Sequence, residues 1–324
     1  MHLTKFQKQL CNKLQDGLPI CEKPFEELAK NLDADEDAVL QKMIRLKQFG
    51  VIRRISALIN YRALGMTGTL VAAHIPQENL QEVAEVVNSL ENVSHNYQRK
   101  HYYNLWFTLQ APTFEQINVT LSKLSGRFGI DFHSLPVERI FKLDVRFDAE
   151  SEGELLSQEV RPIPKQKIIK LTAEENLVLS KLQTDLNITA RPFDSLCGEG
   201  LEIKDVLRII QGLIDNGVIR RIAAVVDHRK LGFSANVLFV SKVPQSRIIK
   251  AGEELARFGI VSHCYQRKTF ENWPYNLFGM MHGKSFGDIQ RAIDKFVEAE
   301  KIDSFELLPT AAELKKQPVK YRFC

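Results

Sequence analysis

The spacing of apolar residues predicts three helices in the first 50 positions. Apolar side chains recur every three to four residues over 6–14, 24–32 and 35–50, which is the period of a helix with one buried face. Gly50 follows the third segment and is typical of a helix end. The β-rich run "VIRRISALI" at 51–59 comes next, and three helices followed by such a run predict a winged helix-turn-helix.

Downstream of this domain, short strands alternate with amphipathic helices. The order is strand, helix, strand, strand, helix, strand, which predicts a ferredoxin-like domain and places the chain in the α+β class. In that order the segments are 67–75, 78–90, 92–100, 105–111, 113–126 and 130–147.

The whole pattern then occurs a second time. "VIRRI" at 51–55 returns at 218–222, an offset of 218 − 51 = 167, and "SHNYQRK" at 94–100 returns as "SHCYQRK" at 262–268, an offset of 262 − 94 = 168. Units of this length indicate a tandem domain duplication and not a solenoid. An acidic and then proline-bearing stretch between them is typical of a linker. The predicted boundaries are 1–62 and 169–229 for the helix-turn-helix domains, 63–148 and 230–324 for the ferredoxin-like domains, and 149–168 for the linker.

Composition narrows the class of protein without naming a function. Of the 324 residues 44% are hydrophobic and 26% are charged, and a net charge of +4 is too small to indicate nucleic acid by itself. No apolar run is long enough to span a membrane, and no signal peptide is expected. The five cysteines form no CxxC pair, so neither a zinc site nor a disulfide framework is expected. A cytoplasmic setting is the simplest interpretation.

The helix that would read DNA carries the wrong charge at its start. Acidic residues there would face the phosphate backbone, although acids also stabilise a helix N-terminus. We therefore expect no specific DNA binding and an architectural or dimerising role for this domain. The acidic residues are Asp33, Asp35, Glu36 and Asp37 in the first unit and Glu199, Glu202 and Asp205 in the second.

The repeated strand is polar on both of its faces. Because side chains alternate along a strand, one face is expected to carry a histidine, a tyrosine and an arginine in each unit. One interpretation is a solvated edge strand whose charges prevent aggregation. The other is a binding site, which better explains why the same side chains occur twice while the surrounding helices differ. This face is formed by His95, Tyr97, Arg99 and His101 in the first unit and by His263, Tyr265, Arg267 and Thr269 in the second.

The chemistry of this face favours a large, flat, polyanionic ligand. Arginine forks bind carboxylates, imidazole titrates near neutrality, and aromatic rings stack on flat molecules. Aromatic residues such as Trp106 follow the strand, either as core or as part of the site. A tetrapyrrole with many carboxylates fits, whereas the absence of a glycine-rich phosphate loop from the sequence argues against a nucleotide.

Over nearly the whole of each unit the sequence resembles the Lrp/AsnC regulators, and "GVIRRISALINYRALG" looks like their wing and entry strand. It departs from them at a turn, where His101 and Asn104 take the approximate positions of a family Gly and Asp. That departure, with "HNYQRK" and "HCYQRK", resembles a narrower branch, the siroheme decarboxylases. A tandem chain is similar to the fused form of that family.

The resemblance implies conversion of siroheme to 12,18-didecarboxysiroheme, in which two acetate side chains lose CO₂ and become methyl groups, in heme d1 or alternative heme biosynthesis. It implies no required cofactor or protein-bound metal, because siroheme carries its own iron; a bound heme is a second candidate ligand. The expected partners are the two units themselves as an internal pseudo-dimer, and a further oligomer or a homologous subunit. An Lrp/AsnC-like regulator and a tetrapyrrole-binding protein without turnover remain the alternatives.

This reaction needs groups that transfer protons and groups that bind carboxylates, and we expect residues of the repeated strand to supply both. A positioned imidazole can donate a proton and recover it, and an arginine fork can hold a carboxylate. The tyrosines would orient the imidazole or the macrocycle, and the lysines lie on the other face. The candidates are His95, His101, His263 and Tyr97 for catalysis, and Arg99, Lys100, Arg267, Lys268, Tyr265 and Trp106 for substrate binding.

Overall fold

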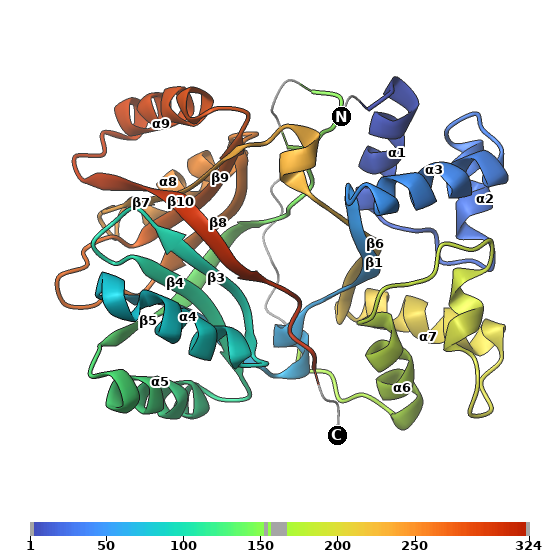
Figure 1. Cartoon of the computed structure of the whole chain (residues 1–324), viewed down its shortest axis with the longest axis horizontal. Coiled ribbons are helices and arrows are strands. Elements are labelled where there is room, and N and C mark those ends of the chain that lie inside the picture. Colours follow the sequence, from blue (N-terminus) through green and yellow to red (C-terminus); the bar gives the residue numbers. More distant parts are fainter. Residues whose placement is uncertain (1–2, 152–154, 157–166, 322–324) are drawn as a thin grey trace.

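Both halves of the chain have the same order of elements in the computed structural model, which describes residues 3–151, 155–156 and 167–321. Each half places a helix-turn-helix in one lobe and a ferredoxin-like domain in the other (Figure 1). In the first unit the elements are α1 (Lys5–Asp16), α2 (Pro24–Lys30), α3 (Glu36–Gln48), β1 (Ile52–Ile59), η1 (Tyr61–Leu64), β2 (Thr67–Ala73), η2 (Gln77–Asn79), α4 (Leu80–Ser89), β3 (Val93–Arg99), β4 (Leu105–Ala111), α5 (Phe114–Phe128) and β5 (Phe132–Leu143). In the second they are α6 (Ala173–Leu182), η3 (Pro192–Leu196), α7 (Ile203–Asp215), β6 (Ile219–Val226), η4 (His228–Leu231), β7 (Ala235–Ser241), α8 (Ile248–Arg257), β8 (Val261–Arg267), β9 (Leu277–Gly283), α9 (Phe286–Glu300) and β10 (Phe305–Lys316).

The two helix-turn-helix domains share one hydrophobic core. Leu10, Leu14 and Val39 of the first unit belong to the same buried cluster as Val206 and Ile210 of the second. The strand after each helix-turn-helix does not fold back as a hairpin of its own unit. Instead β1 pairs antiparallel with β6, and this two-stranded sheet lies on the side of its lobe that faces the barrel (Figure 1).

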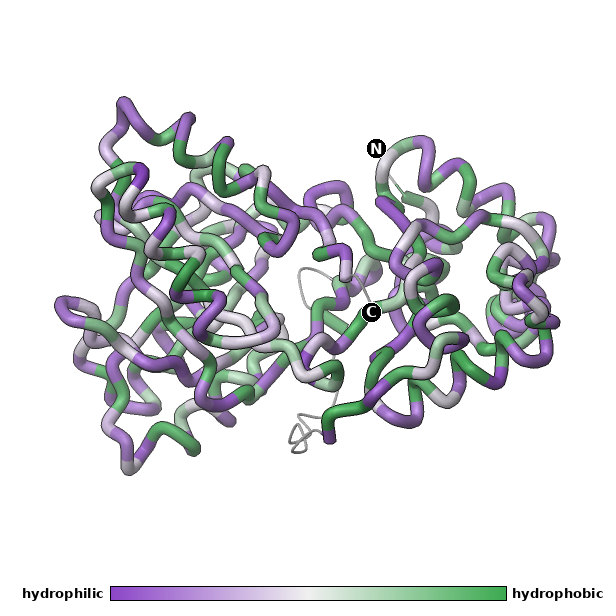
Figure 2. Tube along the Cα trace, turned by 90° about the horizontal axis from the view of Figure 1, so that it is seen from below, coloured by the Kyte–Doolittle hydropathy of each residue, from purple (hydrophilic) through white to green (hydrophobic). Residues whose placement is uncertain are grey.

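Each ferredoxin-like domain packs its two helices on the outer face of its sheet. The strand order is β3-β4-β2-β5 in the first unit and β8-β9-β7-β10 in the second, as the predicted order of elements requires. Apolar residues of α4 and α5 contact one sheet, and those of α8 and α9 contact the other. Hydrophilic and hydrophobic positions alternate along these outer helices, as in amphipathic helices (Figure 2).

The last strand of each unit is long enough to serve two sheets. The first part of β5, up to Pro136, pairs with β2, and the part from Val137 onward pairs with β8 of the other unit. The first part of β10, up to Pro309, pairs with β7, and the part from Thr310 onward pairs with β3. The eight strands therefore close into a barrel in the order β10-β3-β4-β2-β5-β8-β9-β7.

Closure of the barrel decides between the two interpretations of the repeated strand. Both β3 and β8 have a hydrogen-bonded neighbour on each side, so neither is an edge strand, and the edge-strand interpretation is wrong. In the strand order, β3 and β8 stand four places apart in a ring of eight, so they lie opposite one another. Their inward side chains face each other across the barrel.

Close packing of β5 against α8 helps to hold the two units together. Phe141 of β5 is 6% exposed and belongs to the hydrophobic core of the second unit. It lies over Gly252 of α8, where the ring leaves no room for a Cβ atom. Any larger residue at position 252 would push the crossing strand outward. No helix among the described residues is long and apolar enough to cross a membrane.

Candidate active site

A histidine, a tyrosine and an arginine from each repeated strand form a row on the inner wall of the barrel. The ring centroids of His95 and Tyr97 are 6.1 Å apart, and the guanidinium carbon of Arg99 lies 5.4 Å from the centre of the Tyr97 ring. In the second unit the corresponding distances are 5.9 Å and 4.7 Å, for His263, Tyr265 and Arg267. We call these rows the unit-one and unit-two triads.

Both arginines are buried without a carboxylate partner among the described residues. Arg99 is 4% and Arg267 is 8% exposed, and their Nη1 atoms donate to the carbonyl oxygens of Leu308 and Leu135, each at 2.8 Å. The Nε atom of each arginine is buried and has no hydrogen-bond partner within the described ranges of the chain. Burial lowers the pKa of each guanidinium to about 10, which still leaves both charged at neutral pH. The barrel therefore holds two unpaired cations, which is the arrangement that a carboxylate ligand would complete.

The triad histidines are neutral in the unliganded protein. His95 Nδ1 lies 2.8 Å from Ser94 Oγ, and His263 Nδ1 lies 2.9 Å from Ser262 Oγ. Burial is the main cause that lowers the pKa of His95 to about 4 and that of His263 to about 3, and neighbouring cations add to it. The charge of His95 contributes to the shift at His263, so the two imidazoles interact across the barrel. Their pKa values differ from the near-neutral pKa that proton transfer led us to expect.

Three cations at the end of the barrel near the helix-turn-helix lobe were missing from the predicted site. Lys316 of β10 pairs with His95 in the strand register, and burial lowers its pKa. Arg54 and Arg220 extend from the β1–β6 sheet, and their charges lower the pKa values of His95 and His263 respectively. Neither Arg54 nor Arg220 forms an ion pair within the described part of the chain. The repeat of "VIRRI" was the available signal, but packing of the wing explained it equally well.

His101 lies outside the group formed by the triads. The strand ends at Arg99, and His101 belongs to the following turn, where its backbone N–H donates to the Arg99 carbonyl oxygen at 3.0 Å. Its Nε2 atom lies 2.6 Å from Glu306 Oε2, its Nδ1 accepts from the backbone of Tyr103 at 3.0 Å, and its ring meets the Trp273 ring edge-on. His101 therefore does not continue the strand face of His95 and Arg99, and its catalytic role stays a prediction.

The remaining candidates occupy positions that fit a site less well. Lys100 and Lys268 are exposed just beyond the ends of β3 and β8, away from the barrel interior. Trp106 is 1% exposed, donates from Nε1 to the Tyr103 carbonyl oxygen and contacts Trp273, so it forms part of the core that fills the barrel. The side chains that the structure brings together are therefore the two triads and the three cations near them.

The buried histidines make the stability of the fold sensitive to acid. Burial lowers the pKa of His228 from 6.5 to about 4, and it acts in the same direction on His95 and His263. The unfolded chain therefore binds more protons than the folded chain below pH 6.5, and the free energy of unfolding falls as pH drops from about 6.5 to about 4. We expect His228→Phe, which removes one of these groups next to Phe147, to make that fall shallower. Urea unfolding at a series of pH values measures it, and an unchanged slope would contradict the burial effect.

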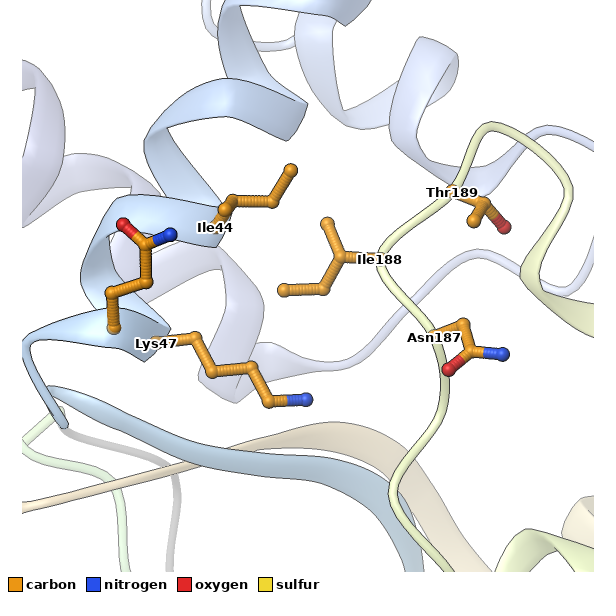
Figure 3. Close-up of a pocket in the computed structure, with 6 residues that line it drawn as sticks. Ile44, Lys47, Asn187, Ile188 and Thr189 are labelled. Atoms are coloured by element: carbon orange, nitrogen blue, oxygen red, sulfur yellow. The ribbon is translucent and has the colours of Figure 1, made fainter.

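A separate cavity of about 430 Å³ lies between α3 and the segment that follows α6 (Figure 3). Ile44 and Ile188 point toward one another across it, and Lys47 lies beside them. Lys47 is already paired with Asp185 at 2.5 Å, so this cavity lacks the free cations of the barrel. The charge arrangement therefore favours the triads as the candidate active site.

Comparison with known proteins agrees with the sequence and with this geometry. Residues 63–142 and 230–315 match the AsnC-like ligand binding domain, and residues 7–53 match the siroheme decarboxylase NirDL-like HTH domain. A siroheme decarboxylase of Hydrogenobacter thermophilus is 34% identical over 311 residues, which cover 95% of this chain and 92% of that protein. The alpha subunit of the siroheme decarboxylase of Desulfovibrio desulfuricans is 34% identical over 151 residues, which cover 47% of this chain and 87% of that subunit.

A solved structure covers both units. The crystal structure of the siroheme decarboxylase NirDL has a TM-score of 0.72 and 31% identity, and the match covers 97% of this chain and 94% of that one. A second crystal structure shows the same enzyme in complex with an iron-uroporphyrin III analogue, with the same similarity to this chain. The tandem helix-turn-helix and AsnC-like domains, matched along nearly their whole length, show that this chain belongs to the siroheme decarboxylase family.

Proposed function

We propose that this chain converts siroheme to 12,18-didecarboxysiroheme by removing CO₂ from two acetate side chains. The observation that carries this proposal is the pair of buried, unpaired guanidinium groups of Arg99 and Arg267 on opposite walls of one barrel. Each lies in a row with an imidazole. Such groups suit a molecule that presents several carboxylates at once. The complex of a related decarboxylase with an iron-uroporphyrin III analogue supports a tetrapyrrole as that molecule.

The size of the barrel suggests how a macrocycle would lie. An eight-stranded barrel has an interior just wide enough for side chains or one small ligand. We therefore infer that the flat macrocycle lies across the end of the barrel near the β1–β6 sheet, with its reacting acetates directed inward. Arg54, Arg220 and Lys316 at this end would bind the carboxylates that do not react.

The chemistry can be balanced with the residues present. Loss of CO₂ breaks the bond between the acetate CH₂ and its carboxyl carbon, and the bonding electrons pass into the polarised ring system. The former CH₂ carbon then gains one proton and becomes a methyl group, so each decarboxylation consumes a proton and neither oxidises nor reduces the molecule. His95 and His263 supply the proton and recover one from solvent, and Tyr97 and Tyr265 orient the imidazoles. Because no electron acceptor is needed, we propose that siroheme, with its own iron, reacts without an added cofactor.

Substrate binding would also prepare the histidines for proton transfer. In the unliganded protein burial and nearby cations keep both imidazoles neutral. Carboxylates placed beside Arg99 and Arg267 would neutralise that positive field and raise the pKa of each imidazole. Proton uptake at the histidines would then accompany binding, just before the reaction consumes a proton.

We further propose that the two units act as an internal pseudo-dimer and that the helix-turn-helix lobe does not read DNA specifically. Each unit's triad depends on the other unit, because Arg99 donates to Leu308 of β10 and Arg267 donates to Leu135 of β5. Exposed acidic residues, among them Asp35, Asp37 and Glu202, stand at the starts of α3 and α7 and would repel phosphates. A regulator of transcription is therefore the less favoured alternative.

Anaerobic incubation of the purified chain with siroheme tests the proposal. We expect mass spectrometry to show the loss of two CO₂ molecules from siroheme, with a singly decarboxylated species preceding the final product. Tight binding without any change in mass would instead support a tetrapyrrole-binding protein. Absence of both binding and turnover would contradict the proposal.

A further inference from the structure

A continuous chain of hydrogen bonds links Arg99 of unit one with His263 of unit two. It runs inside the barrel wall and crosses between the units. The contacts are Arg99 Nη1 to Thr310 Oγ1 (3.2 Å), Thr310 Oγ1 to Asn236 Oδ1 (2.7 Å), Asn236 Nδ2 to His282 Nδ1 (3.4 Å), His282 Nε2 to Ser262 Oγ (3.0 Å) and Ser262 Oγ to His263 Nδ1 (2.9 Å). We call this sequence of contacts the Arg99–His263 chain.

In the first half of the Arg99–His263 chain, each hydrogen bond can have only one direction from donor to acceptor. A guanidinium has donors and no acceptor, so Arg99 must donate to the hydroxyl of Thr310. The Thr310 hydroxyl then donates its own proton to Asn236 Oδ1. With its oxygen occupied, the Asn236 amide presents its NH₂ group to His282. Arg99 therefore determines which atom of Asn236 faces the histidine.

In the second half of the Arg99–His263 chain, the tautomer of His282 determines the direction of the hydrogen bonds. Its Nδ1 accepts from Asn236, so a neutral His282 carries its proton on Nε2 and donates it to Ser262. His282 is 5% exposed, and burial lowers its pKa well below the usual value, so the ring is neutral. The Ser262 hydroxyl has one proton and two acceptors, His263 Nδ1 at 2.9 Å and the Met280 carbonyl oxygen at 3.2 Å. Donation to the nearer acceptor, Nδ1, leaves the proton of a neutral His263 on Nε2. When His263 is protonated, the Ser262 hydroxyl can turn to the Met280 carbonyl oxygen, 3.2 Å away.

The described residues of the first unit form no equivalent of the Arg99–His263 chain. The strand registers place Gly68 and Gln110 where the second unit has Asn236 and His282, because the pair Gly68–Gln110 corresponds to the pair Asn236–His282. Val137, opposite Arg267, likewise stands where Thr310 lies opposite Arg99. The partners of Ser94 are His95 and the hydroxyl of Thr108 at 2.7 Å, and either hydroxyl can be the donor. Thr108 Oγ1 also accepts from the His95 backbone N–H at 3.2 Å, but among the described residues no further side chain fixes the direction of the Ser94–Thr108 hydrogen bond, so either tautomer of His95 can be accommodated.

We propose that His282 is a positioning residue that acts through Ser262 to hold neutral His263 with its proton on Nε2. When substrate binding adds a proton at Nδ1, His263 becomes an imidazolium that can donate the Nε2 proton from the ring edge opposite Ser262 and remain neutral with its proton on Nδ1. Neutral His95 of unit one instead interconverts between tautomers. The two triads look alike but are not equivalent, and His263 is the principal proton donor. The role of this donor in decarboxylation rests on the function proposed above, but the tautomer does not.

Imidazole ¹⁵N chemical shifts of the unliganded, histidine-labelled full chain test the tautomer directly, because protonated and bare ring nitrogens have distinct shifts. We expect His263 to be bare at Nδ1 and protonated at Nε2 in the wild type. In His282→Leu we expect a mixture of tautomers. In His282→Gln the side-chain amide can still donate toward Ser262, so the wild-type tautomer should largely return. Gln110→Leu, at the equivalent position of unit one, should leave the His263 shifts unchanged.

Single-turnover rates with siroheme then measure the consequence. Loss of a residue that orients a reacting group typically lowers activity by roughly 10–100-fold. We expect such a fall for His282→Leu and partial recovery for His282→Gln, with the dissociation constant of siroheme almost unchanged. Gln110→Leu serves as the matched control and should keep its rate.

The outcomes separate this inference from the proposed function. A wild-type His263 that is protonated at Nδ1 would overturn the inference, whatever the enzyme does with siroheme, and so would His263 shifts that His282→Leu leaves unchanged. The wild-type spectrum decides the tautomer even if His282→Leu fails to fold. The predicted shifts in a protein that does not decarboxylate siroheme would instead refute the function and leave the tautomer assignment intact.

Discussion

Arg99→Met and Arg267→Met should each give a protein at least as stable as the wild type that binds siroheme far more weakly. Each guanidinium is buried, keeps an unpaired Nε and has no carboxylate partner in the described parts of the chain. Replacing a buried, uncompensated charge by an apolar side chain of similar length is often neutral or stabilising. Each charge-assisted hydrogen bond to a carboxylate contributes roughly 1.5–3 kcal/mol, so each substitution should weaken binding by about 10–100-fold. Thermal unfolding without ligand and anaerobic titration with siroheme measure the two effects.

Arg139→Met provides the matched control for these substitutions. Arg139 is exposed on β5, in register with Gln266 of β8, so the same change there removes a charge outside the barrel. It should alter neither the melting temperature nor the affinity appreciably. If the Arg99 and Arg267 variants lost many degrees of stability and bound siroheme normally, these arginines would be structural residues and not ligands of the substrate.

His263→Gln should lower the single-turnover rate of decarboxylation by about 10²–10⁴-fold while leaving siroheme bound. Glutamine fills much of the same space and can still contact Ser262, but its amide cannot deliver a proton at neutral pH. His95→Gln should have a smaller effect, because no chain of hydrogen bonds fixes the tautomer of His95. Equal losses at the two positions would remove the distinction between the triads, and wild-type rates in both variants would exclude the histidines as acids.

The fold could be predicted from local patterns, but closure of the barrel could not. Hydrophobic periodicity identified the helices and strands, and the repeated motif identified the duplication. The last segment of the first domain, 130–147, was recognised as a strand, and β5 within it is 12 residues long, whereas its partner β2 has seven. The additional length implies a second partner, but period and composition do not say which strand that is. Pairing of β5 with β8 connects residues 120 to 130 positions apart, from Val137–Arg267 (267 − 137 = 130) to Leu143–His263 (263 − 143 = 120).

The same long-range pairing explains why the sequence alone does not predict that the site is buried. Alternation along the strand correctly grouped His95, Tyr97 and Arg99, but it cannot show whether their common face points to solvent or into a barrel. Only closure reveals that Arg99 is buried, that it donates to the Leu308 carbonyl oxygen, and that burial lowers the pKa of His95. The solvated edge-strand interpretation therefore placed this arginine wrongly at the surface.

His101 shows the limit of extending an alternating pattern past the end of a strand. Alternation assigned it to the face of His95, but β3 ends at Arg99 and the chain turns. The interaction with Glu306 depends on β10 lying beside that turn, and no local signal in the sequence identifies Glu306 as a partner. Lys316 was missed for the same reason, since it reaches His95 only through the pairing of β10 with β3.

The most direct test of the account is a single-turnover reaction of the double variant His95→Gln/His263→Gln with siroheme under anaerobic conditions. Product masses and bound pigment should be measured together over time, with the wild type alongside. If the barrel histidines deliver the protons, the variant should bind one equivalent of siroheme and release it with its mass unchanged, while the wild type loses two CO₂. Loss of both CO₂ molecules at the wild-type rate would contradict the claim that the triads carry out the reaction.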